Sequence, residues 1–433
     1  MNPRSKCTRR RFLETAVKTS AAGAAIGPLL ISRMAHAAGS DVIRLGLVGS
    51  GNRGTGAVCD ALGLGPGARL VALADVLEDR ALSSSRSLTE RFKSQVDLPR
   101  ERIFTGFNAY QQILQSDIDL VLLATPPGFR PLHFEAAVRA GKHVFMEKPM
   151  AVDAPGFRKL IAANEGVKRK SLKVGTGLQH RSQLNCMETV RRIRDGAIGD
   201  VQTMEAYWKS GPGWVRPRRR EQSEMEYQMT NWFNFVWLSG DFIAEQHVHN
   251  LDICQWVKGG HPDRARGTGG RQEWSGLDHG EIFDHFHVEF TYADGTRLLS
   301  DCSNLQAGEH KIGEKITGSL GSATPGAGVI DGKTNWRYTG PESDGHKKEH
   351  EILLDAIRND TPFNQTESAA TSSMMCILGR MAAYEGREIT WDEAIKSEEA
   401  YVPDRYSWDA APPTLPDKFG DYAVPGRSKR RSA

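Results

Sequence analysis

A glycine-rich pattern lies near the start of the chain. Its residues are Gly49, Ser50, Gly51, Asn52, Arg53 and Gly54, which give the spacing G-x-G-x-x-G. Such glycines permit a tight turn and a close approach of the backbone to a pyrophosphate. The pattern follows an apolar run and opens a helix-length segment, whose first N–H groups would face the phosphates. It therefore predicts a dinucleotide site. The alternative is a glycine turn that only packs a strand against a helix.

An acidic residue ends the next apolar run. Asp75 lies 26 residues after Gly49, where a carboxylate can accept hydrogen bonds from both ribose hydroxyls of a dinucleotide. The same carboxylate would repel a 2′-phosphate, so the sequence favours NAD over NADP. NADP stays as the less favoured alternative, because Arg80 could approach a 2′-phosphate.

Lys148 and His249 are the residues that could manage the proton of an alcohol. Oxidation of a secondary alcohol by hydride transfer needs a base for the hydroxyl proton, and a histidine suits that role. Lys148 follows an apolar run, at the sheet edge where ligands bind, and could stabilise a developing alkoxide. On a helix, Glu245, His249 and Asp252 share one face, so either carboxylate could orient the imidazole. The alternatives are a core histidine and a helix-packing aspartate.

The elements that must position these residues alternate between strands and helices. We expect strands at 42–48, 69–75, 118–124 and 143–146, with helices near 53–62, 77–92 and 128–141. The apolar runs are short and continuous, as in strands that are buried on both faces. This alternation predicts an α/β protein that begins with a Rossmann-type, doubly wound parallel sheet.

The pattern changes after residue 175. We expect a helix near 182–196, strands at 201–208, 283–292 and 296–302, and late helices at 347–358 and 368–384. The alternating strands predict an antiparallel sheet with one covered face, and Ala293-Asp294-Gly295 predicts a hairpin. The glycine-rich segment 313–332 is expected to contain a strand and exposed turns. The chain from 401 is rich in proline and should run over the surface.

Several motifs together resemble one enzyme family. Glu147-Lys148-Pro149 resembles the EKP signature of the glucose–fructose oxidoreductase, inositol dehydrogenase and rhizopine-catabolism (Gfo/Idh/MocA) family. The other matching segments are Thr125-Pro126-Pro127 with His133 downstream, Gly141-Lys142-His143, Gly196-Ala197-Ile198-Gly199 and the stretch from Glu245 to Trp256. The resemblance covers about residues 42–400, in order, and is specific to the family but not to one activity.

The resemblance implies a Rossmann domain followed by an α/β domain with a large, mainly antiparallel open sheet that often makes oligomer contacts. It implies substrates that are sugars, cyclitols or their derivatives. By position, Lys148 is the lysine that contacts substrate and cofactor, and His249 is the acid/base histidine. Glu245 departs from the usual aspartate, which leaves its role open, whereas Asp252 fits the family's HxxD pattern.

The remaining site residues follow from the same matches. The predicted cofactor-binding residues outside the glycine loop are Asp75, Thr125, Pro126, His133, Glu147 and Lys148. The segment from Gly175 to Arg181 corresponds to a family segment that lines the substrate site. Gln179 and Arg181 are therefore predicted to bind substrate together with Lys148 and His249. An aromatic-rich stretch at 227–237 could stack on sugar faces, although such clusters more often form core.

The first residues have the order of an export signal. A twin-arginine pattern at 8–13 precedes an Ala- and Gly-rich apolar stretch at 21–31 and a small-x-small site at 35–37. This order predicts a twin-arginine signal peptide over 1–37, hence the twin-arginine export machinery as a partner and a periplasmic or otherwise extracytoplasmic protein. The alternative is an N-terminal helix of the fold. The apolar stretch is too short to span a bilayer durably, and no other segment could do so.

Length and charge set further limits. The 433 residues suggest two domains plus appendages, namely the signal peptide, a Rossmann domain over 38–165, a substrate and oligomerisation domain over 166–400, and a tail over 401–433. The net charge is +3, of which residues 1–37 contribute +6, so the rest carries −3 and makes no electrostatic case for nucleic acid. Five cysteines outside the signal, with no CxxC spacing, predict free thiols and argue against a zinc site or another metal.

Two enzymatic functions fit these patterns. The first is an exported NAD(P)-dependent oxidoreductase that acts on a secondary alcohol of a sugar, polyol or cyclitol, in which the dinucleotide is held tightly and recycled within one site. The alternative is an NAD-dependent glycoside hydrolase or lyase that oxidises the sugar transiently. A non-catalytic binding protein on the same fold is a third possibility, against which Lys148 and His249 argue. An exposed sheet face would favour a homo-oligomer.

Overall fold

The computed structural model describes residues 42–333, 335–418 and 420–426. The predicted signal peptide lies outside these residues. Short runs of aliphatic residues form the first strands because side chains of this kind fill a sheet that is covered on both faces. In β1 and β2, for example, all but two of the residues are buried.

The first sheet is six-stranded and parallel, in the order β3-β2-β1-β4-β5-β6. Its strands are β1 (Ile43–Val48), β2 (Ala68–Asp75), β3 (Ile103–Thr105), β4 (Leu120–Leu123), β5 (His143–Met146) and β6 (Val174–Thr176). The strands are added outward in one direction from β1 to β3 and in the other direction from β4 to β6, which makes this the expected doubly wound Rossmann sheet. The sheet continues past residue 165, since β6 pairs with β5.

Helices connect these strands and cover both faces of the sheet. They are α2 (Asn52–Leu62), α3 (Glu78–Arg91), α4 (Ala109–Gln115), α5 (Arg130–Arg139) and α6 (Ala154–Arg169). The 3₁₀ turns in this half are η1 (Arg100–Arg102) and η2 (Pro127–Phe129). The predicted helices near 53–62, 77–92 and 128–141 are confirmed to within about two residues at each end, which is the usual uncertainty of helix boundaries.

The second sheet has nine strands, in the order β14-β13-β12-β11-β7-β10-β9-β8-β15. They are β7 (Val201–Lys209), β8 (Arg264–Gly270), β9 (His285–Thr291), β10 (Arg297–Ser303), β11 (Lys311–Gly318), β12 (Gly321–Thr324), β13 (Val329–Gly332), β14 (Trp336–Arg337) and β15 (Ile389–Thr390). Only β7 and β10 run parallel; the other pairs are antiparallel. The predicted hairpin joins β9 and β10.

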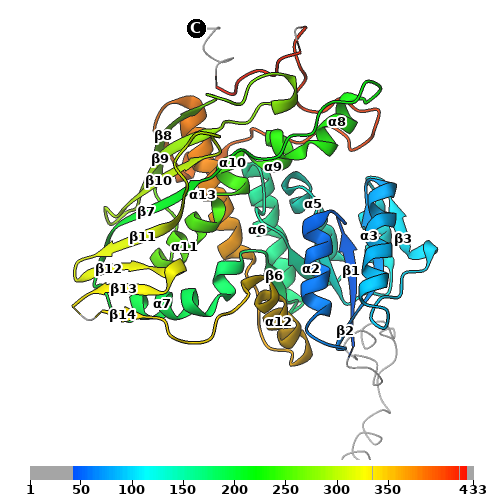
Figure 1. Cartoon of the computed structure of the whole chain (residues 1–433), viewed down its shortest axis with the longest axis horizontal. Coiled ribbons are helices and arrows are strands. Elements are labelled where there is room, and N and C mark those ends of the chain that lie inside the picture. The colour runs from blue at the N-terminus through cyan, green and yellow to red at the C-terminus, as the bar shows by residue number, and fades with distance from the viewer. Residues whose placement is uncertain (1–41, 334, 419, 427–433) are drawn as a thin grey trace, which may run out of the picture. The chain divides into compact units, whose positions relative to one another are not determined.

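Helices pack against one face of this second sheet. The long ones are α7 (Leu184–Arg194), α11 (Val248–Lys258) and α13 (Thr366–Glu385). The shorter elements are η3 (Gln179–Ser182), α8 (Glu224–Thr230), η4 (Trp232–Asn234), α9 (Val236–Ser239), α10 (Phe242–Glu245), η5 (Leu277–His279), η6 (Pro325–Ala327) and α14 (Trp391–Lys396). In Figure 1, α11 and α13 lie on the inner side of the sheet, and α13 also packs against α6 of the first half. One apolar core therefore runs between the two sheets.

The helix α12 (Gly345–Arg358) returns to the first half of the molecule. It packs against α2 and β6, and Leu353, Leu354 and Ile357 join the apolar cluster around β1. The sequence did not predict this contact, because α12 follows β14 of the second sheet and lies far along the chain from α2. The segment 313–332, expected to contain one strand, holds most of β11 and all of β12 and β13.

The cysteines, the lengths of the helices and the C-terminal tail remain to be described. Cys59, Cys186, Cys254, Cys302 and Cys376 are free, and all but Cys59 are buried. Among the described residues, no helix combines the length and the apolar composition that crossing a membrane requires. The tail forms almost no regular structure over 401–426.

A buried carboxyl group lies where α12 meets the glycine loop. Glu349 is 3% exposed, and its two oxygens accept no hydrogen bond from the described residues. Burial, and next the charge of Glu147, raise the pKa of Glu349 well above 4.5. The folded chain therefore holds this proton more tightly than the unfolded chain does, so stability is lost as pH rises from about 4.5 toward the raised value.

We predict that Glu349→Gln stabilises the protein at alkaline pH. The amide is neutral at every pH, so the variant should gain about 1–3 kcal/mol of unfolding free energy at pH 8 and little at pH 4.5. Chemical denaturation at both pH values measures this difference. Glu351→Gln is the matched control, because the Glu351 side chain lies on the same helix and is 44% exposed. Equal gains at the two pH values would contradict the prediction.

Candidate active site

The glycine loop between β1 and α2 is shaped by close contacts that only glycine allows. Gly49 has φ +92°, and a Cβ there would lie 2.6 Å from the backbone of Ala124 and Thr125. A Cβ on Gly54 would lie 1.9 Å from the Gly49 carbonyl oxygen. At Gly51, by contrast, a Cβ would meet nothing within 4 Å. Gly51 caps α2 without any side-chain hydrogen bond, so the first N–H groups of the helix stay available for an anion.

Asp75 is held against this loop. The backbone N–H of Ser50 donates to Asp75 Oδ2 at 2.7 Å, and the Ser50 hydroxyl lies 3.0 Å from the same oxygen. The Leu77 N–H donates to Asp75 Oδ1 at 3.0 Å. The carboxylate thus stands at the end of β2, beside the loop, as a dinucleotide ribose requires. Arg80 lines the same cavity.

A cavity of about 1110 Å³ lies over the carboxyl ends of the first sheet. Every predicted cofactor-binding residue lines it, namely Gly49, Ser50, Gly51, Asn52, Arg53, Gly54, Asp75, Thr125, Pro126, His133, Glu147 and Lys148. These residues lie at the carboxyl ends of β1, β2, β4 and β5 or in the segments that directly follow them. The open glycine loop, the carboxylate at the end of β2 and the size of the cavity fit an extended dinucleotide.

Arg130 fixes the loops after β4 and β5. It is 1% exposed and donates hydrogen bonds to the carbonyl oxygens of Leu123 at 2.5 Å, Thr125 at 2.8 Å and Pro149 at 3.1 Å. Burial lowers the pKa of Arg130 to about 10, so it remains charged at neutral pH. These three bonds tie the residues after β4 to the residues that follow Lys148.

His133 lies beside Arg130 and is neutral. Its ring stacks on Tyr110 at 4.3 Å between centroids, and its Nδ1 lies 3.3 Å from the Thr125 hydroxyl. Burial, together with the charge of Arg130, lowers the pKa of His133 to about 3. It therefore contributes shape and hydrogen bonding to the cavity wall and does not titrate near neutral pH.

Lys148 and Glu245 meet in the lining of the cavity. Lys148 Nζ lies 2.9 Å from Glu245 Oε1 and also donates to the Glu245 carbonyl oxygen. The two side chains are only 13% and 9% exposed. Both residues line the cavity. Lys148 follows β5 of the first sheet, and Glu245 ends α10 of the second half, so the pair spans the two halves of the chain.

His249 lies one turn further along, at the start of α11. Its ring stacks on Trp208 at 5.7 Å and stands nearly perpendicular to His180, also at 5.7 Å. Burial first, and then the charge of Lys148, lower the pKa of His249 well below 6.5. The imidazole is therefore neutral at pH 7. His249 is not among the described residues that line the cavity; Glu245 and Lys148 are.

Asp252 has a different partner from the one its helical spacing suggested. Arg181 Nε lies 2.8 Å from Asp252 Oδ2, and Arg181 Nη2 lies 2.8 Å from Oδ1. The Ser372 hydroxyl also donates to Asp252, at 2.7 Å. The interpretation that Asp252 orients His249 finds no such contact among the described residues. The Arg181 side chain, expected to bind substrate, is 10% exposed and is engaged with Asp252 and Gln255.

Gln179 and Glu147 complete the predicted set. Gln179 begins η3, and its buried Oε1 accepts no hydrogen bond from the described residues, so it remains a candidate for a substrate hydroxyl. Glu147 pairs with Arg53 of the glycine loop, with Nε and Oε1 2.9 Å apart. Arg53 also pairs with Asp60 at 2.8 Å. The ion pair between Arg53 and Glu147 thereby joins the glycine-rich motif to the Glu147-Lys148-Pro149 motif.

Sequence reasoning missed three contributors to the site. Arg130 gave no signal, because an arginine in a helix is ordinarily solvated. Trp208 and His180, which flank His249, belong to segments that were correctly placed but whose side chains were not singled out. Of the aromatic stretch at 227–237, Trp232 lines the cavity, whereas Tyr227, Phe233, Phe235 and Trp237 are buried core.

Comparisons with known proteins agree with this geometry. The family model described as "Oxidoreductase family, NAD-binding Rossmann fold" matches residues 43–176, and the "GFO/IDH/MocA C-terminal domain" matches residues 187–324. Together they cover more than half of the chain.

Two curated relatives are similar in sequence to parts of the chain. A glycosyl hydrolase family 109 protein of Streptomyces niveus is 31% identical over 164 residues, which are 37% of this chain and 31% of that protein. An inositol 2-dehydrogenase of Klebsiella pneumoniae is 27% identical over 218 residues, which are 50% of this chain and 54% of that protein. The matches thus span between a third and about half of these relatives.

The solved structure supports the fold. The aldose-aldose oxidoreductase from Caulobacter crescentus, complexed with glycerol, is 18% identical and has a TM-score of 0.63; the match covers 81% of this chain and 99% of that one. With a Rossmann sheet that carries the glycine loop, a second, mainly antiparallel sheet and both family models matched in sequence, the chain belongs to the Gfo/Idh/MocA oxidoreductase family.

Proposed function

We propose that the chain is an exported NAD-dependent oxidoreductase that acts on a secondary alcohol of a sugar, polyol or cyclitol. The observation that carries the proposal is the Lys148–Glu245 pair in the lining of a cavity that is also lined by the glycine loop and Asp75. A cation and a carboxylate stand beside the nicotinamide end of the cavity, where a hydroxyl could be bound and deprotonated. NAD is favoured over NADP because Asp75 stands where a 2′-phosphate would have to bind.

The residues of the chain divide the chemistry among them. The dinucleotide, when bound, supplies the hydride acceptor or donor. Lys148 donates a hydrogen bond to the substrate oxygen and stabilises alkoxide charge as it develops. Neutral His249 accepts the hydroxyl proton, and Glu245 holds the Lys148 ammonium in place. A glutamate here reaches Lys148 directly, so it can also exchange a proton with substrate when Lys148 turns toward the hydroxyl.

Export and cofactor retention belong together in this proposal. The twin-arginine pattern at the start of the chain favours passage through the twin-arginine machinery after folding, with the dinucleotide already bound. Outside the cytoplasm no free NAD pool replenishes the site, so a tightly held dinucleotide would be reduced and reoxidised by successive sugars. The resemblance to an aldose-aldose oxidoreductase suits such a cycle. A homo-oligomer that uses the open face of the second sheet is part of the same proposal.

The alternative is an NAD-dependent glycoside hydrolase or lyase. The glycosyl hydrolase family 109 relative favours it, and the same residues would serve. Transient oxidation of a sugar carbon assists cleavage of the glycosidic bond, and the hydride then returns to the product. The two functions differ in their products: the oxidoreductase releases an oxidised sugar together with a reduced sugar or NADH, whereas a hydrolase or lyase releases a cleaved glycoside with no net NADH.

We predict that the purified mature protein carries bound nicotinamide and turns over a sugar, polyol or glycoside. A panel of such compounds, scored by NADH absorbance and by product mass, measures both functions at once. Oxidised product with matching reduction of an added sugar or of NAD supports the oxidoreductase. Cleaved product without net NADH would instead establish the alternative. A protein without bound cofactor and with weak NAD affinity would remove the case for recycling.

Lys148→Ala should lower kcat by about 10²–10³-fold, because the group that stabilises the alkoxide is removed. Lys159→Ala is the control, since the Lys159 side chain is 44% exposed on α6. Steady-state rates and NADH titration of both variants give the comparison. Unchanged activity in Lys148→Ala would show that the role assigned to this lysine is wrong.

Gly54→Ala should weaken dinucleotide binding at least about tenfold. Its Cβ would meet the Gly49 carbonyl oxygen at 1.9 Å, so the loop that faces the pyrophosphate would have to move. Gly56→Ala is a matched control in the same helix, because its Cβ would meet only the Arg53 side chain at 3.7 Å. NADH fluorescence titration, with thermal unfolding to check the fold, distinguishes them. Equal affinities would count against a pyrophosphate at this loop.

A further inference from the structure

The cavity over the first sheet has a second wall. Besides the Rossmann loops, it is lined by residues from the segment that follows β7 and from α8 and η4. These residues are Trp214, Val215, Arg216, Met229, Thr230 and Trp232. We call residues 213–232 the cover. Because both walls line one cavity, a dinucleotide bound there lies between the Rossmann loops and the cover.

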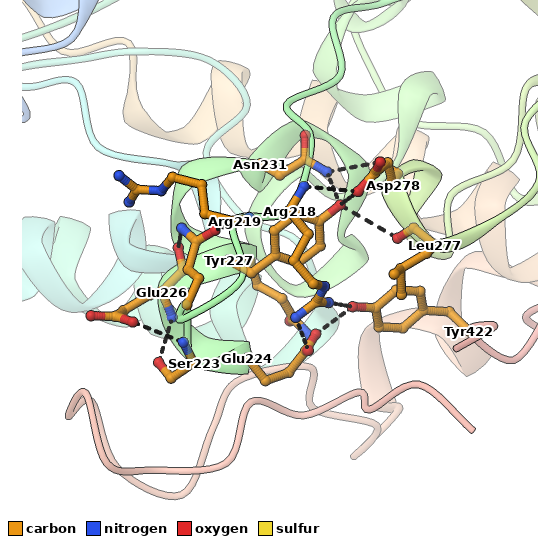
Figure 2. A network of polar contacts seen from close by, with 12 residues as sticks. Arg218, Arg219, Ser223, Glu224, Glu226, Tyr227, Asn231, Leu277, Asp278 and Tyr422 are labelled. Carbon is orange, nitrogen blue, oxygen red and sulfur yellow. Dashed lines mark hydrogen bonds and ion pairs between the residues drawn. The ribbon is translucent and has the colours of Figure 1, made fainter. Parts of the chain in front are cut away.

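A polar network fixes the cover, as Figure 2 shows. Arg218 Nη1 lies 2.7 Å from Glu224 Oε2, and Arg218 Nη2 lies 2.8 Å from the Tyr422 hydroxyl. The Arg218 guanidinium stacks on the Tyr227 ring at 3.9 Å. The Tyr422 hydroxyl also contacts Glu224, and the Tyr227 hydroxyl lies 3.0 Å from Asp278 Oδ1. The cover is thus braced by a residue from the end of the chain.

The C-terminal segment, residues 401–418 and 420–426, contacts the cover at further points. We call this segment the strap. Gln228 Nε2 donates to the carbonyl oxygen of Thr414 at 2.8 Å. The Tyr422 ring packs edge-on against Phe235 at 5.1 Å, just beyond the cover. Tyr422 is 4% exposed, so the end of the strap is buried against this part of the fold.

The strap also contacts the opposite wall. Trp408 packs on Phe107 at 4.8 Å, and Tyr406 packs on Phe129 at 4.9 Å. Phe107 follows β3 and Phe129 follows β4, and both line the cavity. The strap therefore joins the Rossmann loops to the cover, although none of its own residues is among the described residues that line the cavity.

The charge of the cover suits an anionic ligand. Arg216 lines the cavity with its guanidinium 5.4 Å from the Trp214 ring centroid, and it forms no ion pair with the described residues. A pyrophosphate carries negative charge that such a cation complements. Arg218, two residues further along the chain, by contrast forms an ion pair with Glu224.

We propose that the strap keeps the cover closed over the dinucleotide and so sets the rate at which the cofactor leaves. This inference rests on the proposed function, since it requires a dinucleotide in the cavity. Release requires the walls to separate, and separation must break the aromatic contacts of Trp408 and Tyr406 and the bonds of Tyr422. None of these contacts involves Lys148 or Glu245, so loosening the strap changes cofactor release and leaves the chemical step intact.

The test compares cofactor release from four proteins. The mature protein, Trp408→Ala, Tyr422→Phe and the control Leu415→Ala are loaded with NADH, and release is followed by fluorescence while lactate dehydrogenase and pyruvate consume the free NADH. Leu415 lies in the strap but is 55% exposed. Trp408→Ala should release NADH about tenfold faster, because a large aromatic contact is lost. Tyr422→Phe keeps its ring on Phe235 and loses only its hydroxyl contacts, so a smaller acceleration is expected. Leu415→Ala should match the unmodified protein.

The outcomes separate the two proposals. If Trp408→Ala and Tyr422→Phe release NADH at the rate of the unmodified protein, the proposed role of the strap is wrong and the proposed function is unaffected. Failure of the unmodified protein to bind NADH overturns both. Single-turnover rates measured with bound cofactor should be the same in all four proteins, and a loss of the chemical step in Trp408→Ala would also contradict the inference. Thermal unfolding confirms that each variant is folded.

Discussion

The ion pair between Lys148 and Glu245 is the interaction on which the site depends. Two charges that are nearly buried are stable only if each has a partner, because the loss of hydration must be compensated. Here the partners come from different halves of the chain, one after β5 and one at the end of α10. The spacing of the two sheets therefore sets the position of the ammonium group, and the continuous core between α6 and α13 keeps that spacing fixed.

A second set of buried charges keeps the surrounding loops in place. Arg130 holds three carbonyl groups around the ends of β4 and β5, and Arg53 joins the glycine loop to Glu147. Arg181 of η3 pairs with Asp252 of α11. From the local sequence, each of these arginines would be expected to bind a ligand or to face solvent. In the structure, each one instead orients another part of the site. The neutral ring of His249 is held in a different way, by its contacts with the rings of Trp208 and His180.

Local patterns predicted the elements well and their long-range partners poorly. The buried strands, the glycine loop and the hairpin after β9 follow from periodicity and turn chemistry over a few residues. Lys148 and Glu245 were both candidates, but their direct contact depends on how two sheets meet. The same holds for Asp252, whose place on the helix was predicted while its partner, Arg181, was not. The aromatic side chains of Tyr406 and Trp408 gave no signal, since an extended tail without periodicity can pack anywhere on the surface.

The most direct measurement is a crystal structure of the protein with NADH and a bound sugar or polyol. The account predicts that the nicotinamide ring lies beside Lys148 and Glu245, with Lys148 Nζ within about 3 Å of the reacting hydroxyl and His249 facing the same oxygen. A nicotinamide ring at another part of the cavity, or a substrate hydroxyl out of reach of both Lys148 and His249, would contradict it.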